Sequence, residues 1–463
     1  MNALSNSNNV NPIRKSIIQA QLYGKRLISV VLTVAICLSI LNILDYIYVN
    51  DCVSWERTIM NELSEQEDNI DLLYLGSSHV FTSVIPEKMD SINGRNNFNL
   101  ATPAQSYMTS YYLLKEALRH NDLEHVYLEM YYMIPYVRGD LNNIEVMSTH
   151  WDILYQMPLS LNKLDYGYHL LNKQYGLMTL FPIRRFANHV FDTQYIKTNL
   201  EQKKSENYKN AVYTLDPQAP TFKKGFCTIS GHIEPGTFEG NTGAIPGDWE
   251  DENAKTYLNK IIDLCQRKNI DLTFFTAPMP DFRLCCMGNY DQYIAQVNDI
   301  ANKYGLRYYD FNLCNTKYLN LQNDKYIMDY DHLGYEGAQL FTDILAEVLL
   351  DELECNPIPE DMFYASYNEK LRQIDQRIFG LDIQENSSGK QKIYTIYSID
   401  NLVETEAEFR ITKQCEGDTQ PITVQEWSTQ NCVTFPEIET GVFIVEARPV
   451  QSKEVTNRVE INY

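Results

Sequence analysis

Apolar and polar positions alternate in two different ways along the central part of this chain. Short apolar runs, which are typical of buried strands, occur at 70–75, 98–100, 125–131, 270–276 and 306–311. Stretches with apolar residues three or four positions apart, which are typical of amphipathic helices, occur at 107–119, 254–267, 291–304 and 335–353. Strands that alternate with helices in this way predict a three-layer α/β fold, in which helices cover both faces of a parallel sheet.

A longer apolar run lies near the N-terminus. Residues 27–44 contain no charged side chain and the apolar character continues to Val49, which is long enough to cross a hydrocarbon core of ~30 Å as a helix. Basic residues precede the run and acidic residues follow it: Arg14, Lys15, Lys25 and Arg26, then Asp45, Asp51 and Glu56. We therefore predict a cytoplasmic tail over 1–26 and a single transmembrane helix over 27–49 in the cell membrane. The rest of the chain is expected on the extracytoplasmic side.

Two other interpretations of this run are open. A cleaved signal peptide would need a small-x-small site after the apolar run, and none follows it. A lipoprotein attached at Cys37 is disfavoured by the bulky Ile36 before it. The sequence therefore favours a retained anchor.

The segment 134–247 interrupts the alternation of strands and helices. Its first half is helical and aromatic in pattern, and residues 230–247 are rich in Gly and Pro, as loops are. We interpret residues 50–353 as one α/β domain with an insertion at about 134–247. The insertion lies after a strand, at the edge where loops set specificity, but a purely structural subdomain explains it equally well.

The pattern changes again near the C-terminus. Apolar and polar residues alternate over 392–399, 406–412, 422–427, 441–447 and 458–463, with turn-forming residues between these runs. We predict a linker over 354–390 and a small antiparallel β-domain over 391–463, with the character of a sandwich.

Composition narrows the possible functions. The 463 residues carry a formal charge of -22, with 61 acidic against 39 basic residues, which argues against a nucleic-acid partner. The ten cysteines would permit disulfides in an exported chain, and Cys415 with Cys432 is the best candidate pair. No cluster of Cys and His has the spacing of a zinc site, so we expect neither a metal nor another cofactor.

Two short motifs have the residues of nucleophilic catalysis. Gly76-Ser77-Ser78-His79 ends the first predicted strand, and Asp329-x-x-His332 precedes the last predicted helix. A serine hydroxyl becomes a good nucleophile when an imidazole takes its proton and a carboxylate orients that imidazole. We expect Ser78 to be the nucleophile, His332 the base and Asp329 its partner. Asp331 is a rival partner, although its side chain points less naturally at the ring of its neighbour.

These motifs resemble the blocks of the SGNH/GDSL hydrolase superfamily. Gly76-Ser77-Ser78 matches the first block, residues 99–106 the second, and Asp329-x-x-His332-Leu333 the last, over about residues 68–353. The resemblance implies a flavodoxin-like three-layer sheet and catalysis through Ser78, His332 and Asp329, without a cofactor. A Gly-Ser-Ser block behind one membrane helix is similar to the D-alanyl-teichoic-acid transfer and alginate-type O-acetylation proteins. Those families imply extracytoplasmic acyl transfer to surface polymers, with acyl groups supplied by a membrane-bound O-acyltransferase.

The chain departs from the superfamily at the oxyanion hole. Besides the Ser78 N–H, the second block normally offers the N–H of a glycine, and here the candidates are Thr102 and Ala104, because Pro103 has no N–H. The asparagine of the third block is absent, and the third strand instead reaches Glu129, which could not donate while ionised. A side chain such as Asn99 or Gln105 would have to compensate. His79 follows the nucleophile and either lies near the site or simply packs.

The sequence thus supports two functions of different kinds. The first is a membrane-anchored extracytoplasmic acyltransferase or esterase that acts on acyl groups, foremost acetyl, of a cell-surface polysaccharide. The second is a non-catalytic surface protein that binds or assembles glycans on a degenerate fold of this type, with the β-domain as its binding module.

Overall fold

The structure is a computed structural model, and it describes residues 12–463 apart from 53, 67–68, 135–138, 214–222, 229–250, 404, 416, 418, 437–439 and 451. The first eleven residues of the predicted tail and the whole Gly- and Pro-rich segment 230–247 therefore lie outside the described residues. Two compact units make up the chain. Met1–Ser54 and Gly167–Val212 form the first unit, and Trp55–Tyr166 and Tyr213–Tyr463 form the second.

Five parallel strands form the central sheet of the second unit, as the alternation of strands and helices predicts. The strands are β1 (Leu72–Leu75), β2 (Asn97–Asn99), β3 (His125–Glu129), β4 (Asp271–Thr276) and β5 (Arg307–Asp310). Their order in the sheet is β2-β1-β3-β4-β5, which is the order of flavodoxin-like sheets. The direction of strand order reverses at β1 and β3, so the carboxyl ends of these two strands flank the usual place for a site.

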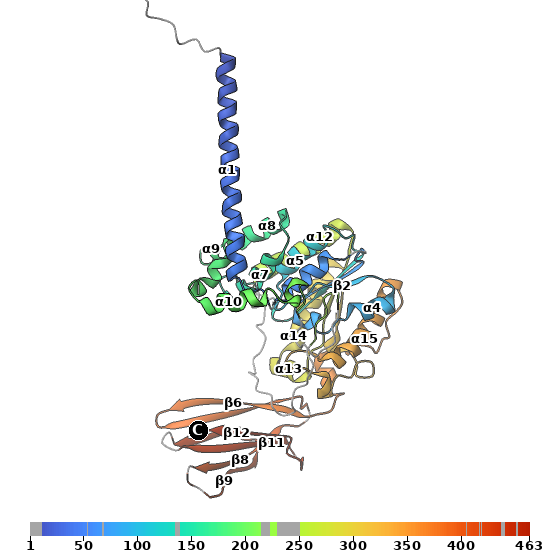
Figure 1. Cartoon of the computed structure of the whole chain (residues 1–463). Coiled ribbons are helices and arrows are strands. Elements are labelled where there is room, and N and C mark those ends of the chain that lie inside the picture. The colour runs from blue at the N-terminus through green and yellow to red at the C-terminus, as the bar shows by residue number, and fades with distance from the viewer. Residues whose placement is uncertain are drawn as a thin grey trace, which may run out of the picture. The chain divides into compact units, whose positions relative to one another are not determined.

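Helices cover this sheet on two sides (Figure 1). The main ones are α4 (Pro86–Asn93), α5 (Tyr107–Ala117), α12 (Glu252–Lys268), α14 (Tyr290–Tyr304) and α15 (Tyr335–Glu354). Helix α4 packs with α15, and α5 packs with α12. Right-handed crossovers place α4 and α5 on opposite faces, because the chain moves in opposite directions along the sheet after β1 and after β2.

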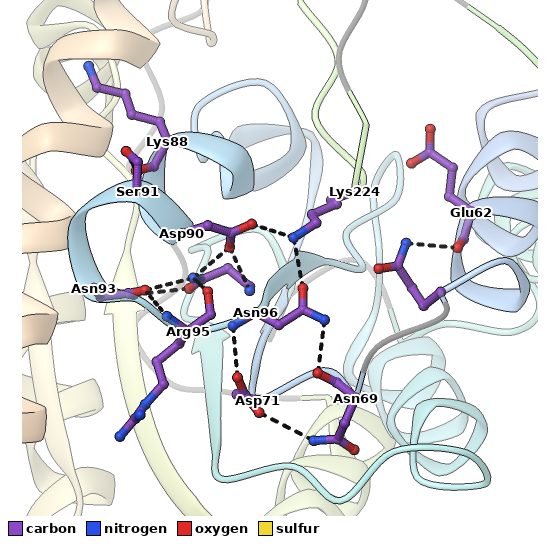
Figure 2. Close-up of polar contacts among 12 residues, drawn as sticks. Glu62, Asn69, Asp71, Lys88, Asp90, Ser91, Asn93, Arg95, Asn96 and Lys224 are labelled. Carbon is purple, nitrogen blue, oxygen red and sulfur yellow. Dashed lines mark hydrogen bonds and ion pairs between the residues drawn. The ribbon is translucent and has the colours of Figure 1, made fainter.

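Polar side chains fix the amino ends of β1 and β2, at the edge opposite the site (Figure 2). The Asp71 carboxylate accepts the Asn96 N–H at 2.8 Å, and the Asn96 amide donates to the Asn69 carbonyl at 2.8 Å. The Lys224 ammonium donates to Asn96 Oδ1 at 2.7 Å and forms an ion pair with Asp90. This network is satisfied internally, and we assign it the structural role of setting the register of the two strands.

One helix of the first unit has the length and hydropathy to cross a membrane. Helix α1 spans Pro12–Tyr48, and an 18-residue stretch within Gln21–Tyr48 has a mean hydropathy of 2.7 and no buried residue. The helix itself thus continues on the N-terminal side of the predicted residue 27, through Lys25 and Arg26. It fits either a single-pass anchor or a signal sequence.

The described part of the insertion is helical, as its pattern indicates. It contains α7 (Ile144–Gln156), α8 (Leu161–His169), α9 (Gly176–Leu180), the 3-10 helix η1 (Pro182–His189), α10 (Thr193–Gln202) and α11 (Glu206–Lys209). Residues 167–212 belong to the same compact unit as α1, rather than to the unit that contains the sheet. Part of the insertion therefore forms one compact unit with helix α1.

The C-terminal region contains two antiparallel sheets, in the orders β10-β7-β6 and β12-β11-β8-β9. Their strands are β6 (Ile378–Ser388), β7 (Gln391–Asp400), β8 (Ala407–Cys415), β9 (Ile422–Ser428), β10 (Cys432–Pro436), β11 (Gly441–Pro449) and β12 (Asn457–Asn462). Buried side chains from both sheets share one apolar core, which includes Tyr394, Phe435 and Phe443. This arrangement agrees with the expected β-domain.

Two details of the prediction for this region are wrong. The segment 354–390 is not only a linker, because it contains the short helix α16 (Tyr367–Leu371) and strand β6. No disulfide joins Cys415 and Cys432, and the Cys415 Sγ lies 3.4 Å from the Tyr463 hydroxyl. The two cysteines are close in sequence, but Cys415 lies in the four-stranded sheet and Cys432 in the three-stranded sheet.

Candidate active site

Ser78 lies where the chain leaves the sheet after β1. Ser77 has extended backbone angles and caps the short helix α3 (Ser78–Phe81), and its hydroxyl accepts the His79 N–H at 3.3 Å. Ser78 is therefore the first helical residue, and its side chain is partly exposed beside buried neighbours. An N–H at this position has no partner within the helix.

Gly76 is required by the close approach of β3 to this turn. A Cβ atom at Gly76 would lie 2.7 Å from the Cβ of Glu129 and 2.4 Å from Cγ2 of Val80. Real Cβ atoms do not approach other atoms so closely, so a side chain here would push the turn away from β3. The glycine of the motif thus helps to position Ser78, because its missing side chain leaves room for Glu129 and Val80.

His332 reaches Ser78 from a loop 254 residues further along the chain. Its Nε2 lies 2.7 Å from the Ser78 Oγ, and its Nδ1 lies 2.9 Å from each carboxylate oxygen of Asp329. Because the Asp329 carboxylate only accepts hydrogen bonds, Nδ1 carries the ring proton and Nε2 is left to accept the Ser78 O–H. The structure thus brings together the three residues that the sequence motifs single out.

Backbone groups hold Asp329 in place. Its Oδ1 accepts the N–H groups of Asp331 and His332 at 2.8 and 2.9 Å. Burial acts to raise the pKa of Asp329, but the hydrogen bonds and charge of His332 and the two N–H groups outweigh it, so the pKa lies below its ordinary value. Asp329 therefore stays ionised, as an orienting carboxylate must.

Asp331, the rival orienting residue, has a different partner. Its carboxylate forms an ion pair with Nε of Arg283 at 2.7 Å. Arg283 lies on α13 (Asp281–Met287), and sequence reasoning missed it because nothing in that helix marks it as part of the site. The structure therefore favours Asp329 as the partner of the imidazole.

Most of the predicted oxyanion donors are occupied. The Asn99 amide donates to the carbonyls of Val80 and Val84 at 2.9 and 3.0 Å, so it braces the segment after Ser78 instead. The Thr102 N–H donates to the Gly76 carbonyl at 3.2 Å. The Gln105 amide donates to the Ser110 hydroxyl at 2.9 Å. These contacts overturn the predicted roles of Asn99 and Thr102, since a donor that is already paired is not free for a developing charge.

Two of the predicted donors remain available. In the part of the chain that the structure describes, neither the Ser78 N–H nor the Ala104 N–H has a hydrogen-bond partner. Ala104 has a φ of 50°, a left-handed conformation that favours glycine. Of the two candidates Thr102 and Ala104, only Ala104 has this backbone conformation.

Trp55 supports both this loop and the helix of Ser78. Its indole Nε1 donates to the Ala101 carbonyl at 3.0 Å. Its ring packs against Phe81, the last residue of α3, with the ring centroids 5.2 Å apart. Trp55 is itself buried, so one aromatic side chain braces the nucleophile and the candidate oxyanion loop together.

Glu129 is the last residue of β3. It is fully buried, and its Oε2 accepts the Ser77 N–H at 2.5 Å. Burial raises the pKa of Glu129 to about 7, and the hydrogen bonds from Ser77 only partly offset this rise. Near neutral pH the group is thus a mixture of carboxylate and carboxylic acid, and the acid form is a hydrogen-bond donor.

His79 is buried beside the imidazole of His332. The two ring centroids lie 4.8 Å apart, and the ring of Tyr131 contacts His79 from another side at 4.3 Å. Neither ring nitrogen of His79 has a hydrogen-bond partner among the residues that the structure describes. Burial, together with the charge of His332, holds the pKa of His79 well below its ordinary value. His79 is therefore a neutral packing partner of His332.

No group of three or more His, Cys, Asp or Glu side chains is arranged to hold a metal ion among the residues that the structure describes. The candidate site combines one hydroxyl, one imidazole, one carboxylate and backbone N–H groups.

Comparisons with known proteins find similarity only at the level of solved structures. No protein-family model matches the sequence, and no curated protein matches it either. A protein from Bacteroides fragilis named as an acylhydrolase aligns with 64% of this chain and 94% of its own, at 6% identity and a TM-score of 0.27. A two-domain esterase active on acetylated mannans aligns with 85% of this chain and 89% of its own, at 9% identity and a TM-score of 0.27.

A third structure, a gut microbial diltiazem-metabolizing enzyme, aligns with 72% of this chain and 57% of its own, at 10% identity and a TM-score of 0.19.

Proposed function

We propose that the protein is a membrane-anchored, extracytoplasmic serine acyltransferase or esterase of the SGNH/GDSL kind. The observation that carries the proposal is the continuous line from the Ser78 hydroxyl through the His332 ring to the Asp329 carboxylate, with distances of 2.7 and 2.9 Å. The flavodoxin-like strand order and the position of Ser78 at the carboxyl edge of β1 support the same assignment.

The first half of the reaction acylates the enzyme. The Ser78 Oγ attacks the carbonyl carbon of an ester as its proton passes to Nε2 of His332, and Asp329 stabilises the imidazolium that forms. The carbonyl oxygen becomes an oxyanion, which the N–H groups of Ser78 and Ala104 would stabilise. The intermediate then collapses, the leaving alkoxide takes the proton from His332, and the acyl group remains on Ser78.

The second half transfers the acyl group. An acceptor hydroxyl gives its proton to Nε2 of His332 and attacks the acyl carbon, and Ser78 recovers its own proton as the ester breaks. A sugar hydroxyl as acceptor makes the protein a transferase, and water makes it an esterase. We favour acetyl as the acyl group and a cell-surface polysaccharide as its carrier, in line with the resemblance of Gly76-Ser77-Ser78 and Asp329-x-x-His332 to that superfamily.

The anchor supports transfer. A retained helix α1 would hold the site close to a membrane-bound O-acyltransferase that supplies acyl groups, with the N-terminus inside the cell and the bulk of the chain outside. The acidic net charge of -22 disfavours a strongly anionic acceptor.

A serine-directed fluorophosphonate probe tests this proposal on the full chain in membranes. We expect the wild type to be labelled, and Ser78→Ala and His332→Ala to lose labelling. Ser91→Ala is the matched control, because Ser91 lies exposed on α4 and should leave labelling unchanged. A chromogenic acetate ester, supplied with and without oligosaccharides, then distinguishes the two activities. An esterase releases free acetate, and a transferase places the acetyl group on the sugar.

The alternative is a non-catalytic glycan-binding or assembly protein. It is favoured by one observation, namely that Asn99, Thr102 and Gln105 are all engaged while Glu129 replaces the asparagine. A folded wild-type protein that resists the probe but retains surface glycan would support this alternative and contradict the enzyme.

A further inference from the structure

The first unit exposes an unusual number of large apolar side chains next to the membrane helix. Leu177 and Leu180 on α9 are 56% and 57% exposed, and Phe191, just after η1, is 94% exposed. Leu171 is exposed as well, and we refer to the four residues Leu171, Leu177, Leu180 and Phe191 as the apolar collar. A single exposed residue of this kind is ordinary, but four of them within 21 consecutive positions indicate a surface that binds a partner or a membrane.

The collar is fixed to the end of α1 by hydrogen bonds within the same unit. The Ile183 N–H donates to the Asp45 carboxylate at 3.1 Å, and the Tyr48 hydroxyl donates to the Val190 carbonyl at 3.2 Å. The Asn199 amide donates to the Ile47 carbonyl at 2.9 Å. Figure 1 shows α9 and α10 beside the end of α1 that leads into the rest of the chain.

These bonds set the depth of the collar relative to a bilayer. Asp45 and Tyr48 are three positions apart, or ~5 Å along the helix. If α1 spans the membrane, the segment bonded to both residues must lie about where the helix leaves the hydrocarbon. Helices that lie in the interface bury their apolar faces by ~5–10 Å, so the collar is at the right level to do the same.

The charge of the segment also differs from that of the whole protein. Residues 167–191 contain Lys173, Arg184 and Arg185 but no Asp or Glu, in a chain with a net charge of -22. Five of these residues are Tyr or Phe, namely Tyr168, Tyr175, Phe181, Phe186 and Phe191. Basic side chains suit lipid phosphates, and aromatic side chains are enriched at the level of the headgroups.

We propose that the apolar collar lies in the outer headgroup region of the membrane and contacts phospholipid acyl chains, so that the protein is held by an interfacial surface as well as by α1. The occupant is lipid rather than a membrane protein, because basic, aromatic and aliphatic residues occur together here as they do in interfacial helices. The inference rests on the retained anchor of the proposed function.

Tryptophan quenching by brominated lipid tests the inference on the full chain. Phe191→Trp and Leu180→Trp would be reconstituted in vesicles of phosphatidylcholine and phosphatidylglycerol, with or without bromine on the acyl chains. We expect bromine to lower the added fluorescence of both variants roughly twofold, as expected for side chains at the acyl boundary. Asn207→Trp is the control, since Asn207 is exposed and its neighbour Tyr208 bonds to Asp51, beyond the end of α1.

The outcomes separate the inference from the assumptions beneath it. Quenching of the collar variants but not of Asn207→Trp supports lipid contact. Equal quenching in all three variants, in protein that resists carbonate extraction and retains probe labelling, overturns the collar while leaving the anchor and the enzyme intact. If the collar is shielded from solvent only in native membranes and is not quenched in pure lipid vesicles, its partner is a protein. That result would also overturn the inference. Extraction by carbonate would overturn the anchor itself.

Discussion

The Glu129 carboxylate accepts the Ser77 N–H at 2.5 Å, which ties the end of β3 to the turn that carries Ser78. The other oxygen of this carboxylate, Oε1, has no hydrogen-bond partner within the described part of the chain, although the residue is fully buried. A buried carboxylate that is only half satisfied is costly when it is charged. The turn therefore contains a group whose charge opposes folding, directly beside the nucleophile.

Glu129→Gln should remove this cost. The pKa of Glu129 is about 7 in the folded protein, against 4.5 for an unperturbed Glu, so the unfolded chain loses this proton first as pH rises. The free energy of unfolding of the wild type should fall relative to that of the variant by up to about 3 kcal/mol between about pH 4.5 and 7, and then level off. Urea unfolding of both proteins at pH 5 and pH 8 measures the difference, and a difference that is independent of pH would contradict the assignment.

Asp329→Asn should lower kcat for ester hydrolysis by about 10²–10⁴, because the amide no longer fixes the imidazole in the tautomer that accepts the Ser78 proton. Asp331→Asn breaks only the ion pair with Arg283 and should cost less than about tenfold. Steady-state hydrolysis of an aryl acetate measures both. Equal losses in the two variants would mean that Asp331 shares the orienting role.

Gly76→Ala should cost about 1–3 kcal/mol of folding free energy, because the new methyl group would overlap Glu129 and Val80. Its probe labelling should slow as well, since the turn that carries Ser78 must move. Gly176→Ala is the matched control, because the nearest atom to its methyl group is Leu171 Cδ2 at 3.9 Å, and it should change stability by less than about 0.5 kcal/mol. Thermal unfolding of both variants gives the comparison.

His79→Phe should retain kcat/KM within about tenfold, because the ring nitrogens of His79 bond to nothing and a phenyl ring fills a similar space. His79→Ala leaves a cavity beside His332 and should lower stability by about 2–4 kcal/mol, with a larger loss of activity. If His79→Phe were as inactive as His332→Ala, then His79 would have a role in proton transfer that packing does not explain.

The parts of the site that could be predicted are those with a local signature. Gly76-Ser77-Ser78 marks the end of a strand, and Asp329 and His332 are near enough in sequence for one turn to join them. Parallel strands then bring the two motifs to one edge. The apolar runs likewise predicted the strands, because β1, β2 and β3 are buried along their whole length and β4 along all but its first residue.

What could not be predicted depends on partners that are distant in sequence. Asn99 looks like a free donor until the structure shows the carbonyls of Val80 and Val84 next to it. Arg283 has no signature of its own, and only the fold brings it to Asp331.

The C-terminal errors have the same origin. The polar residues around Gly389 resemble a linker, but they form the turn of a long hairpin between β6 and β7, with Gly389 at a φ of 66°. Sequence proximity of Cys415 and Cys432 gave no information about which sheet each strand would join.

The position of Trp55 determines where the protein can be shortened for study in solution. A shortened protein without the apolar segment has few possible starting positions, because Tyr48 ends α1 and Trp55 already contacts both Phe81 and Ala101. A secreted version should therefore start between these two positions. Versions that start later would lack Trp55, so the turn that carries Ser78 would no longer be held in place and activity would fall. This loss is easily mistaken for a requirement for the lipid bilayer.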